Sequence, residues 1–267
     1  MDIILENIIC KDYLELGLGT TKLAKKYNVT KDFCKKIIHK RKLMRNQYEP
    51  NCVFDIWTEE SAYFYGLLMS DGSFRKTKDS REKNKKSDFT YEIRLRMIDL
   101  EIIEKFCDFL SLPRFRIKFE YSTTPKGNKS KLYCINYSNR YLCNQLEKIG
   151  LPTGKKSAIV AIPSTLPNDL LSHLIRGYYD GDGTVGIYTN KNNRILHRFG
   201  ICSMNKKLLE FFLKSIPVEA GYIQTIKRNF YNLIYSTHRD NFVTIRNYLY
   251  KDATVFLERK RNIFFSI

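Results

Sequence analysis

The sequence lacks several features, and each absence removes a class of protein. No run of about 18 uncharged apolar residues occurs, so no membrane-spanning helix is expected. Asp2 and Glu6 stand where a signal peptide would carry positive charge. The seven cysteines are scattered and never spaced as C-x-x-C, and no two of the four histidines lie at metal-ligand spacing. We therefore expect an intracellular, cytoplasmic protein with no membrane partner, no disulfide framework and no zinc site.

Acidic residues are also scarce relative to basic ones. The chain has 28 Asp and Glu against 46 Lys and Arg, which gives a formal net charge of +18. Since 43% of the 267 residues are hydrophobic, the chain has enough apolar side chains to fold around a sizeable core in one to three domains. A positive surplus of this size attracts polyanions, so the composition predicts a nucleic-acid partner.

The first fifty residues are predicted to form short helices. Apolar residues recur at helical spacing over 3–16, a second helix covers 20–27, and Thr30 is placed to cap a third helix. This arrangement is typical of a helix-turn-helix, with Lys35 and Lys36 on the exposed side available for DNA. An ordinary helical hairpin with solvated lysines is the alternative.

Two later segments resemble each other. "SAYFYGLLMSDGSF" occupies residues 61–74 and "LIRGYYDGDGTV" occupies 174–185, and their alignment places Gly66 on Gly177 and Asp71 on Asp182 at a constant offset of 111. Alternating and helical patterns follow each copy in the same order, which indicates a duplicated αββαββα unit. The predicted fold class is α+β, with a small all-α segment at 1–50 and two halves at 51–155 and 156–267.

Two of the predicted strands are basic on one face. In "YEIRLRM", Arg94 and Arg96 alternate with apolar residues, and "RFRIKFEY" is interpreted as a second such strand. In that second strand Phe115, Ile117, Phe119 and Tyr121 would face the core, and Arg114, Arg116 and Lys118 would face outward. A two-stranded basic ribbon fits the major groove of double-stranded DNA. Arg75 and Lys76 open a basic loop, 75–86, expected to contact phosphates; a solvated hairpin is the alternative.

Each repeated segment is predicted to be a helix that ends at an acid followed by glycine. Gly66 with Ser70, and Gly177 with Gly181, stand four residues apart, so each helix has a small face that lets another backbone approach closely. If the two helices pack on these faces, Asp71 and Asp182 project together. Paired carboxylates repel each other unless a cation lies between them, and oxygen-only ligation suits Mg²⁺. This predicts phosphodiester hydrolysis, although a single Asp-Gly would indicate only a turn.

At this point the chain resembles a known family. "FYGLLMSDG" at 64–72 and "IRGYYDGDG" at 175–183 are similar to the two motifs of monomeric LAGLIDADG homing endonucleases, and "YLYKDATVFLERKRNIF" at 248–264 is similar to their usual ending. The resemblance covers about residues 55–267. It implies two halves that form a saddle over DNA, Mg²⁺-dependent cleavage of both strands across the minor groove, and short 3′ overhangs.

The resemblance also assigns residues to the site. Asp71 and Asp182 would be the catalytic, metal-binding acids, helped by the backbone carbonyls of Ser70 and Gly181. It further implies a basic residue in each half, for which Arg140 and either His238 or Arg239 are the candidates. The first motif departs from the pattern at two positions: Met69 is expected to pack, and Tyr65 to turn away from the partner helix.

Three functions therefore stay open. The first is a site-specific double-strand DNA endonuclease, intron-encoded or free-standing, that acts on a long, near-asymmetric target site. It is expected to act as a monomer because one chain supplies both acids. The second is a non-cleaving DNA-binding regulator, and the third an RNA splicing cofactor. A self-splicing intein is not expected, because the chain starts with Met1 and ends in "FFSI". A richness in Lys, Asn, Ile and Tyr is typical of an AT-rich genome and points to a bacterial or phage-infected host.

Overall fold

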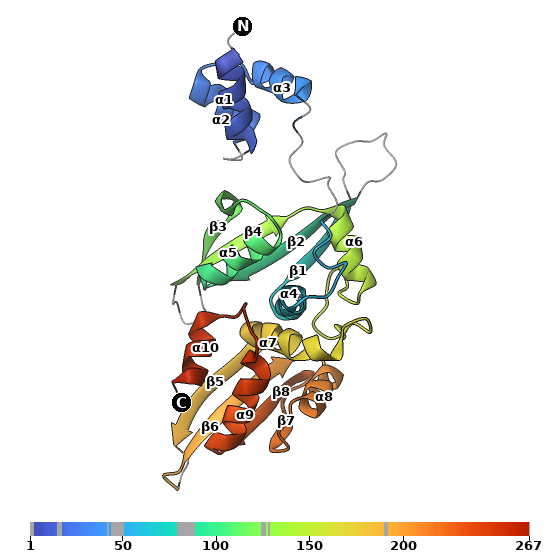
Figure 1. The fold of residues 1–267 in the computed structure, drawn as a ribbon, viewed down its shortest axis with the longest axis vertical. Coiled ribbons are helices and arrows are strands. Elements are labelled where there is room, and N and C mark those ends of the chain that lie inside the picture. The colour runs from blue at the N-terminus through green and yellow to red at the C-terminus, as the bar shows by residue number, and fades with distance from the viewer. Residues whose placement is uncertain are drawn as a thin grey trace.

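A computed structural model of the protein describes residues 3–14, 18–41, 43, 51–78, 89–123, 127, 129–189 and 192–266. Most of the predicted basic loop at 75–86 and of the segment joining residue 41 to residue 51 lies outside these residues. The elements in chain order (Figure 1) are α1 (Ile3–Leu14), α2 (Thr20–Tyr27), α3 (Lys31–Lys40), α4 (Glu59–Ser70), β1 (Ser73–Lys78), β2 (Phe89–Met97), α5 (Leu100–Phe109), the 3₁₀ turn η1 (Arg114–Arg116), β3 (Lys118–Thr123), β4 (Lys129–Tyr137), α6 (Arg140–Lys148), the 3₁₀ turn η2 (Asn168–Leu170), α7 (Leu171–Asp182), β5 (Gly183–Thr189), β6 (Ile195–Ser203), α8 (Lys206–Ser215), β7 (Gly221–Lys227), β8 (Phe230–Thr237), α9 (Arg239–Tyr250) and α10 (Glu258–Phe265).

The first three helices pack on a small core of their own. Asn28 ends α2 with a left-handed φ of 51°, and its N–H donates to Ala24 O, so the chain turns within three residues. Thr30 then caps α3, because its hydroxyl accepts a hydrogen bond of 3.1 Å from Phe33 N. Four buried side chains fill the centre of this unit: Ile9, Leu23, Cys34 and Ile37. The predicted N-terminal helices are therefore present.

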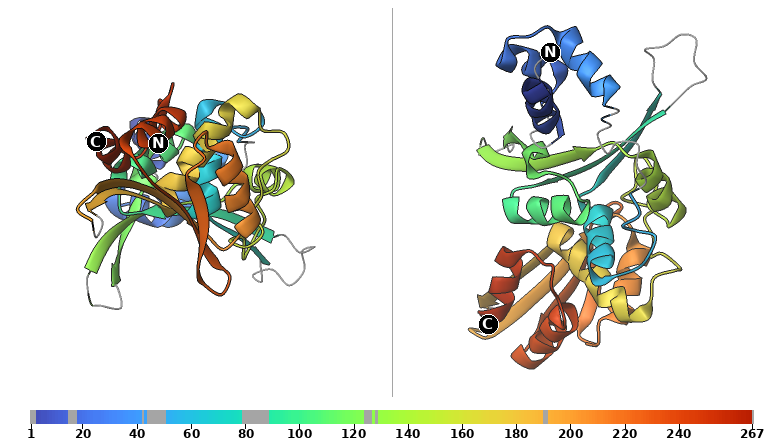
Figure 2. Two further views of the ribbon diagram at one scale, coloured as in Figure 1. Left: turned by 90° about the horizontal axis from the view of Figure 1, so that it is seen from below. Right: turned by 45° about the horizontal axis from the view of Figure 1, so that its top comes forward.

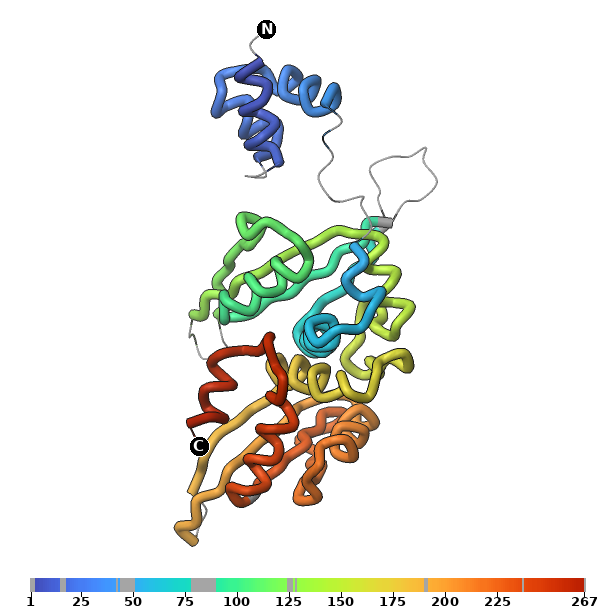
Figure 3. Tube along the Cα trace, in the orientation of Figure 1, coloured from blue at the N-terminus to red at the C-terminus, as the bar shows by residue number. Residues whose placement is uncertain are grey.

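The remainder of the chain repeats one unit twice, as the duplication predicts. A helix, two strands, a helix, two strands and a helix run from α4 to α6 and again from α7 to α9. The sheets have the equivalent orders β1-β2-β4-β3 and β5-β6-β8-β7, with every pair antiparallel. Figures 1 and 3 show α4 beside α7 at the centre of this region, with one sheet on either side. The fold is α+β and pseudo-symmetric.

Glycine allows α4 and α7 to approach closely. A Cβ on Gly66 would overlap Leu174 O and lie 2.9 Å from Tyr178 N, and one on Gly177 would overlap Tyr63 O. Because these neighbours are backbone atoms, only a residue without a side chain fits at either position. Tyr65 points away from α7, as expected, and donates from its hydroxyl to Ile149 O at 3.1 Å while its ring contacts Trp57.

Each sheet has one face covered by helices and one face open. In the left view of Figure 2 the helices lie above and the strands of both sheets lie below. Ile93, Leu95 and Met97 of β2 are buried in the core, which confirms the alternation predicted for that strand. The side chains between them lie on the open face. Among the described helices, none is both long and apolar enough to cross a membrane.

The interpretation of "RFRIKFEY" as one strand with a buried apolar face is wrong. Its first three residues form the 3₁₀ turn η1, and β3 begins only at Lys118. Phe119 and Tyr121 are 58% and 68% exposed, because β3 is the edge strand and α5 packs mainly on the neighbouring strands β2 and β4. Their rings contact each other instead, with centroids 6.1 Å apart. Local alternation predicted the face of these rings, but not whether another element covers it.

Candidate active site

The two predicted acids lie at the adjoining ends of the two central helices. Asp71 is the C-cap of α4 and Asp182 is the last residue of α7. A Cβ on Gly181 would lie only 2.5 Å from the Asp71 carboxylate oxygen Oδ2, so the two helix ends are in contact at this point. Both acids keep exposed surface. The structure therefore brings the predicted pair together at the junction of the two sheets.

The surroundings of the pair favour protonation. Burial, and next the negative charge of Asp182, raise the pKa of Asp71 to about 6, while Lys260, Lys156 and Arg96 oppose the shift. Burial also raises the pKa of Asp182, against the attraction of the same two lysines. Each carboxylate thus lies in a place where a positive charge would stabilise its ionised form.

Two buried lysines lie beside the acids, one for each helix. Lys156 Nζ donates to Ser70 O at 3.0 Å and also to Met69 O, in the last turn of α4. Lys260 Nζ donates to several carbonyls at the end of α7, namely those of Tyr179 at 2.7 Å, Asp180 at 2.9 Å, Gly181 at 3.4 Å and Gly183 at 2.7 Å. An ammonium group at the negative end of a helix is favourable. Burial lowers the pKa of both lysines to about 8, against the attraction of the nearby aspartates.

The carboxylate and carbonyl oxygens at the two helix ends are suitable ligands for a hard divalent cation. Within the described residues no cluster of three or more His, Cys, Asp and Glu side chains occurs. At this site the acidic ligands are therefore the two carboxylates of Asp71 and Asp182. Mg²⁺ is often held by one or two carboxylates together with water and phosphate oxygens. The carbonyls of Ser70 and Gly181, which the family resemblance implied as further ligands, already accept a hydrogen bond from a lysine. Because a carbonyl oxygen has two lone pairs, each retains capacity for a second partner.

The basic residues chosen from the sequence lie elsewhere on the halves. Arg140 is the first residue of α6, with its guanidinium 5.9 Å from the centre of the Tyr91 ring. His238 and Arg239 lie exposed at the start of α9. None of these three is among the charges that shift the pKa of either acid.

Sequence reasoning thus missed Lys156 and Lys260. Both follow the last helix of a repeated unit: Lys156 lies after α6, at the predicted boundary between the halves, and Lys260 lies within α10, which follows α9. A search for a basic residue at the equivalent end of each copy, rather than directly after the last strand, would have found them.

The open sheet face carries some of the predicted DNA-binding residues but not all. Arg75, Arg94, Arg96 and Lys118 occupy alternate positions that the pairing registers place on the open face of the first sheet. Lys76 lies on the opposite face, the same side as buried Phe74, with its Nζ 5.2 Å from the Tyr91 ring centre.

Arg114 and Arg116 also differ from the prediction. Arg114 forms ion pairs with Asp108 at 2.6 Å and Glu104 at 3.5 Å on α5, and the Arg116 guanidinium lies 5.9 Å from the ring of Tyr137, a residue of the core. The reason is the 3₁₀ turn, which removes both arginines from the strand whose alternation was used to place them.

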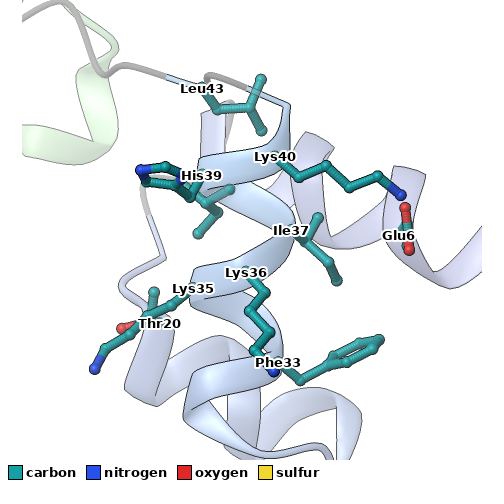
Figure 4. Close-up of a pocket in the computed structure, with 10 residues that line it drawn as sticks. Glu6, Thr20, Phe33, Lys35, Lys36, Ile37, His39, Lys40 and Leu43 are labelled. Atoms are coloured by element: carbon teal, nitrogen blue, oxygen red, sulfur yellow. The ribbon is translucent and has the colours of Figure 1, made fainter.

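The N-terminal helices expose the predicted lysines of α3. Figure 4 shows Lys35 and Lys36 projecting from α3 near an open groove whose lining includes Phe33, Ile37 and Leu43. Lys35 forms an exposed ion pair of 3.2 Å with Asp32. Pairs of this kind stabilise little in water, so both ammonium groups stay available to a polyanion.

A buried polar network ties the C-terminal segment to the central helices. Arg176 is fully buried and donates to Leu249 O at 2.7 Å, to Val255 O at 3.1 Å and to the Glu59 carboxylate. Asp180 accepts 2.7 Å and 2.8 Å hydrogen bonds from the Tyr63 hydroxyl and Leu257 N. These bonds fix the segment that leads into α10, and they therefore position Lys260 over the end of α7.

No family model matches the chain. A stretch of 201 residues, 74% of the chain, is 24% identical to part of a DNA polymerase of Acanthamoeba polyphaga mimivirus. A stretch of 180 residues, 65% of the chain, is 27% identical to part of a reverse gyrase of Methanocaldococcus jannaschii. The chain spans only about a tenth of the length of these relatives, 11% and 9%.

Among solved structures, the crystal structure of the LAGLIDADG meganuclease I-AabMI bound to uncleaved DNA matches 76% of this chain and 88% of that chain. The TM-score is 0.51 and the sequence identity is 13%. A likeness at this identity establishes the fold.

Proposed function

We propose that this chain, which has the fold of the LAGLIDADG homing endonucleases, is a site-specific endonuclease that cleaves both strands of double-stranded DNA. The observation that carries the proposal is the contact between the ends of α4 and α7, where Asp71 and Asp182 meet between two open sheet faces. Because a single chain supplies both acids and both sheets, it acts as a monomer.

Different residues of the chain bind the DNA and catalyse its cleavage. The open face of the first sheet, with Arg94 and Arg96, holds the duplex through phosphate and base contacts. Asp71 and Asp182 are the catalytic groups at the scissile phosphates. Lys156 and Lys260 fix the helix ends and offset part of the negative charge around the acids.

A divalent cation such as Mg²⁺, held by Asp71 and Asp182, supplies polarisation of the phosphate and a water molecule of lowered pKa. The carboxylates must be ionised to hold it. Since the pKa of Asp71 is about 6 without a cation, cleavage requires a pH above that value or a cation concentration high enough to displace the proton.

The paired acids favour cleavage over a purely regulatory role. A protein that only binds DNA gains affinity by neutralising phosphates, and two carboxylates close to phosphates oppose that gain. Here both acids also have raised pKa values, so they cost free energy in the folded protein at neutral pH. A function that uses the carboxylates explains why the site carries both.

The N-terminal helices extend the recognised site under this proposal. The three-residue turn between α2 and α3 and the exposed Lys35 and Lys36 are typical of a helix that enters the major groove. Deletion of residues 1–50 is expected to shorten the protected footprint on DNA and to leave the cut position unchanged. An unaltered footprint would refute the DNA-binding role of this segment.

The decisive experiment is selection of cleaved duplexes from a random library in the presence of Mg²⁺. The parent chain and an Asp182→Asn variant are compared, with Asp169→Asn as the control because it removes the same charge from an exposed position before α7. Specific cuts by the parent and the control, and none by Asp182→Asn, support the proposal. A parent chain that binds one sequence tightly, yet never cuts it with any divalent cation, would indicate the regulatory function instead.

A further inference from the structure

The two open sheet faces are equivalent in geometry but not in chemistry. Ser73 and Thr184 each stand two residues after a catalytic acid, and they pair with Arg94 and Gly200 respectively. The position of Arg94 in the first sheet is therefore occupied by Gly200 in the second. One alternation further along β2 and β6, Arg96 corresponds to Cys202 in the same way.

The same comparison extends to the neighbouring strands. Lys118 lies across β4 from Arg96, and Gln224 lies across β8 from Cys202. Asn136, paired with Arg94, corresponds to Ile234, paired with Gly200. The cations at these positions of the first sheet are thus replaced by neutral residues in the second. Among the described open-face residues of the second sheet, the positive charges are Arg198 of β6 and Lys227 at the end of β7, both at positions farther from the acids.

Two of the differing positions lie close to the acids. The charge of Arg96 acts on Asp71, and the charge of Asp182 acts on Cys202, so these two equivalent residues each lie near one acid. The first sheet thus presents the guanidinium groups of Arg94 and Arg96 and the ammonium group of Lys118 on this part of its open face. At the equivalent places the second sheet has a glycine, a thiol and an amide, and an apolar side chain takes the place of Asn136.

Glu120 holds the two arginines in fixed positions. Arg94 Nη2 donates to both carboxylate oxygens of Glu120 at 3.0 Å, and Arg96 Nη1 donates to Oε1 at 2.8 Å. The hydrogen bond from Arg96 lowers the pKa of Glu120, which therefore stays ionised. A guanidinium has five donors, and the carboxylate orients its plane. Arg96 keeps its Nε and Nη2 donors for a base edge, and Arg94 keeps the two donors of Nη1, because its Nε is buried and its Nη2 donates to Glu120. A sheet that served only for phosphate attraction would gain nothing from a carboxylate at this position.

We infer which bases each half of the target carries next to the cut: the half-site under the first sheet carries guanines read by Arg94 and Arg96, and the half-site under the second sheet is A·T. This inference rests on the proposed function, because it assumes that a duplex lies across both open faces. Arginine donates two hydrogen bonds to guanine O6 and N7, glutamine pairs with adenine, and an apolar side chain contacts the thymine methyl group. Glu120 is a positioning residue, which acts on the bases only through the two arginines.

The test is a binding selection with the full chain on a library of random duplexes, with Ca²⁺ in place of Mg²⁺ so that binding is measured apart from cleavage. The selected duplexes are then incubated with Mg²⁺ to locate the cut. The expected consensus has G·C pairs on one side of the cut and A·T pairs at the equivalent positions on the other side. A sequence that is selected and cleaved but has the same composition on both sides would overturn this inference and leave the proposed function standing. If no sequence is enriched or cut, the proposed function fails, and the inference fails with it.

Variants assign each half-site to its sheet. Arg96→Cys, which introduces the residue of the second sheet, is expected to reduce discrimination for guanine about 5- to 150-fold in one half-site alone. Gln224→Ala is the matched control, and it should change the base preference only in the other half-site. A base preference unchanged by Arg96→Cys, or changed equally in both half-sites, would contradict the assignment.

Glu120→Gln separates positioning from a loss of folding. The amide has nearly the same shape but removes a negative charge, so affinity for random DNA should rise while discrimination for guanine falls. A merely structural defect would lower both quantities. Affinity for random DNA that rises with discrimination unchanged would refute the positioning role of Glu120.

Discussion

Replacing Gly177 by alanine tests the helix contact on which the position of both acids depends. The added Cβ would overlap Tyr63 O and lie 3.0 Å from Leu67 N, both of them backbone atoms of α4 that cannot rotate away. The helices must therefore separate by about 1–2 Å to restore van der Waals distances. Such overpacking typically costs about 1–3 kcal/mol, and the higher helix propensity of alanine offsets about 1 kcal/mol. With backbone on both sides, we expect a net loss of about 2 kcal/mol.

Chemical denaturation measures this loss. Trp57, the only tryptophan, lies against Tyr65 of α4 with ring centroids 5.6 Å apart, so its fluorescence reports on the region of the contact. Gly186→Ala is the matched control, because a Cβ there meets nothing within 4 Å. A Gly177→Ala variant that unfolds at the same denaturant concentration as the parent would refute the close contact.

Two further readouts sharpen the test. Gly66→Ala separates the same two helices, since its Cβ would overlap Leu174 O, so the double variant should lose less stability than the sum of the two single variants. Cleavage should fall further than stability alone explains, because a displacement of about 1 Å between catalytic groups costs on the order of 100-fold in rate. Additive losses of stability with unchanged cleavage would show that the helix contact does not set the position of the acids.

Three other predictions concern charged residues of the central helices and of α10. Asp71→Asn should stabilise the cation-free protein at pH 7 and have little effect below pH 4. The reason is that the folded-state pKa of Asp71, about 6, lies above the ordinary 3.8, so ionisation of the carboxylate opposes folding. Thermal unfolding across pH checks this, and equal effects on stability at both pH values would contradict it. Lys260→Met should move the pH profile of cleavage to higher pH, since the positive charge that lowers the pKa of Asp71 is removed; an unchanged profile would exclude that influence. Arg176→Met should lower the free energy of unfolding by about 3–5 kcal/mol, because Glu59 is left without its cation. The loss should shrink when Glu59→Gln is added. If the losses of the two single variants simply add in the double variant, the two residues are not coupled.

Part of the site was predictable because it depends on short segments. The repeat of Gly66 and Asp71 as Gly177 and Asp182 shows two small helix faces that end in acids, and the absence of side chains on those faces is what permits the close packing seen in the structure. The alternation in β2 likewise predicted which side chains are buried, because each strand residue points opposite to its neighbours.

The sequence by itself therefore determined the duplication, the order of elements in each half and the paired acids, since helix and strand periodicities are properties of consecutive residues. Only the tertiary structure decided that Lys156 and Lys260 reach the helix ends, that Lys76 lies behind the sheet, and that Arg94 and Arg96 share Glu120. Each of these outcomes depends on strand register or on a contact between residues far apart in the chain. Such contacts are set by the packing of whole elements, which no local pattern encodes.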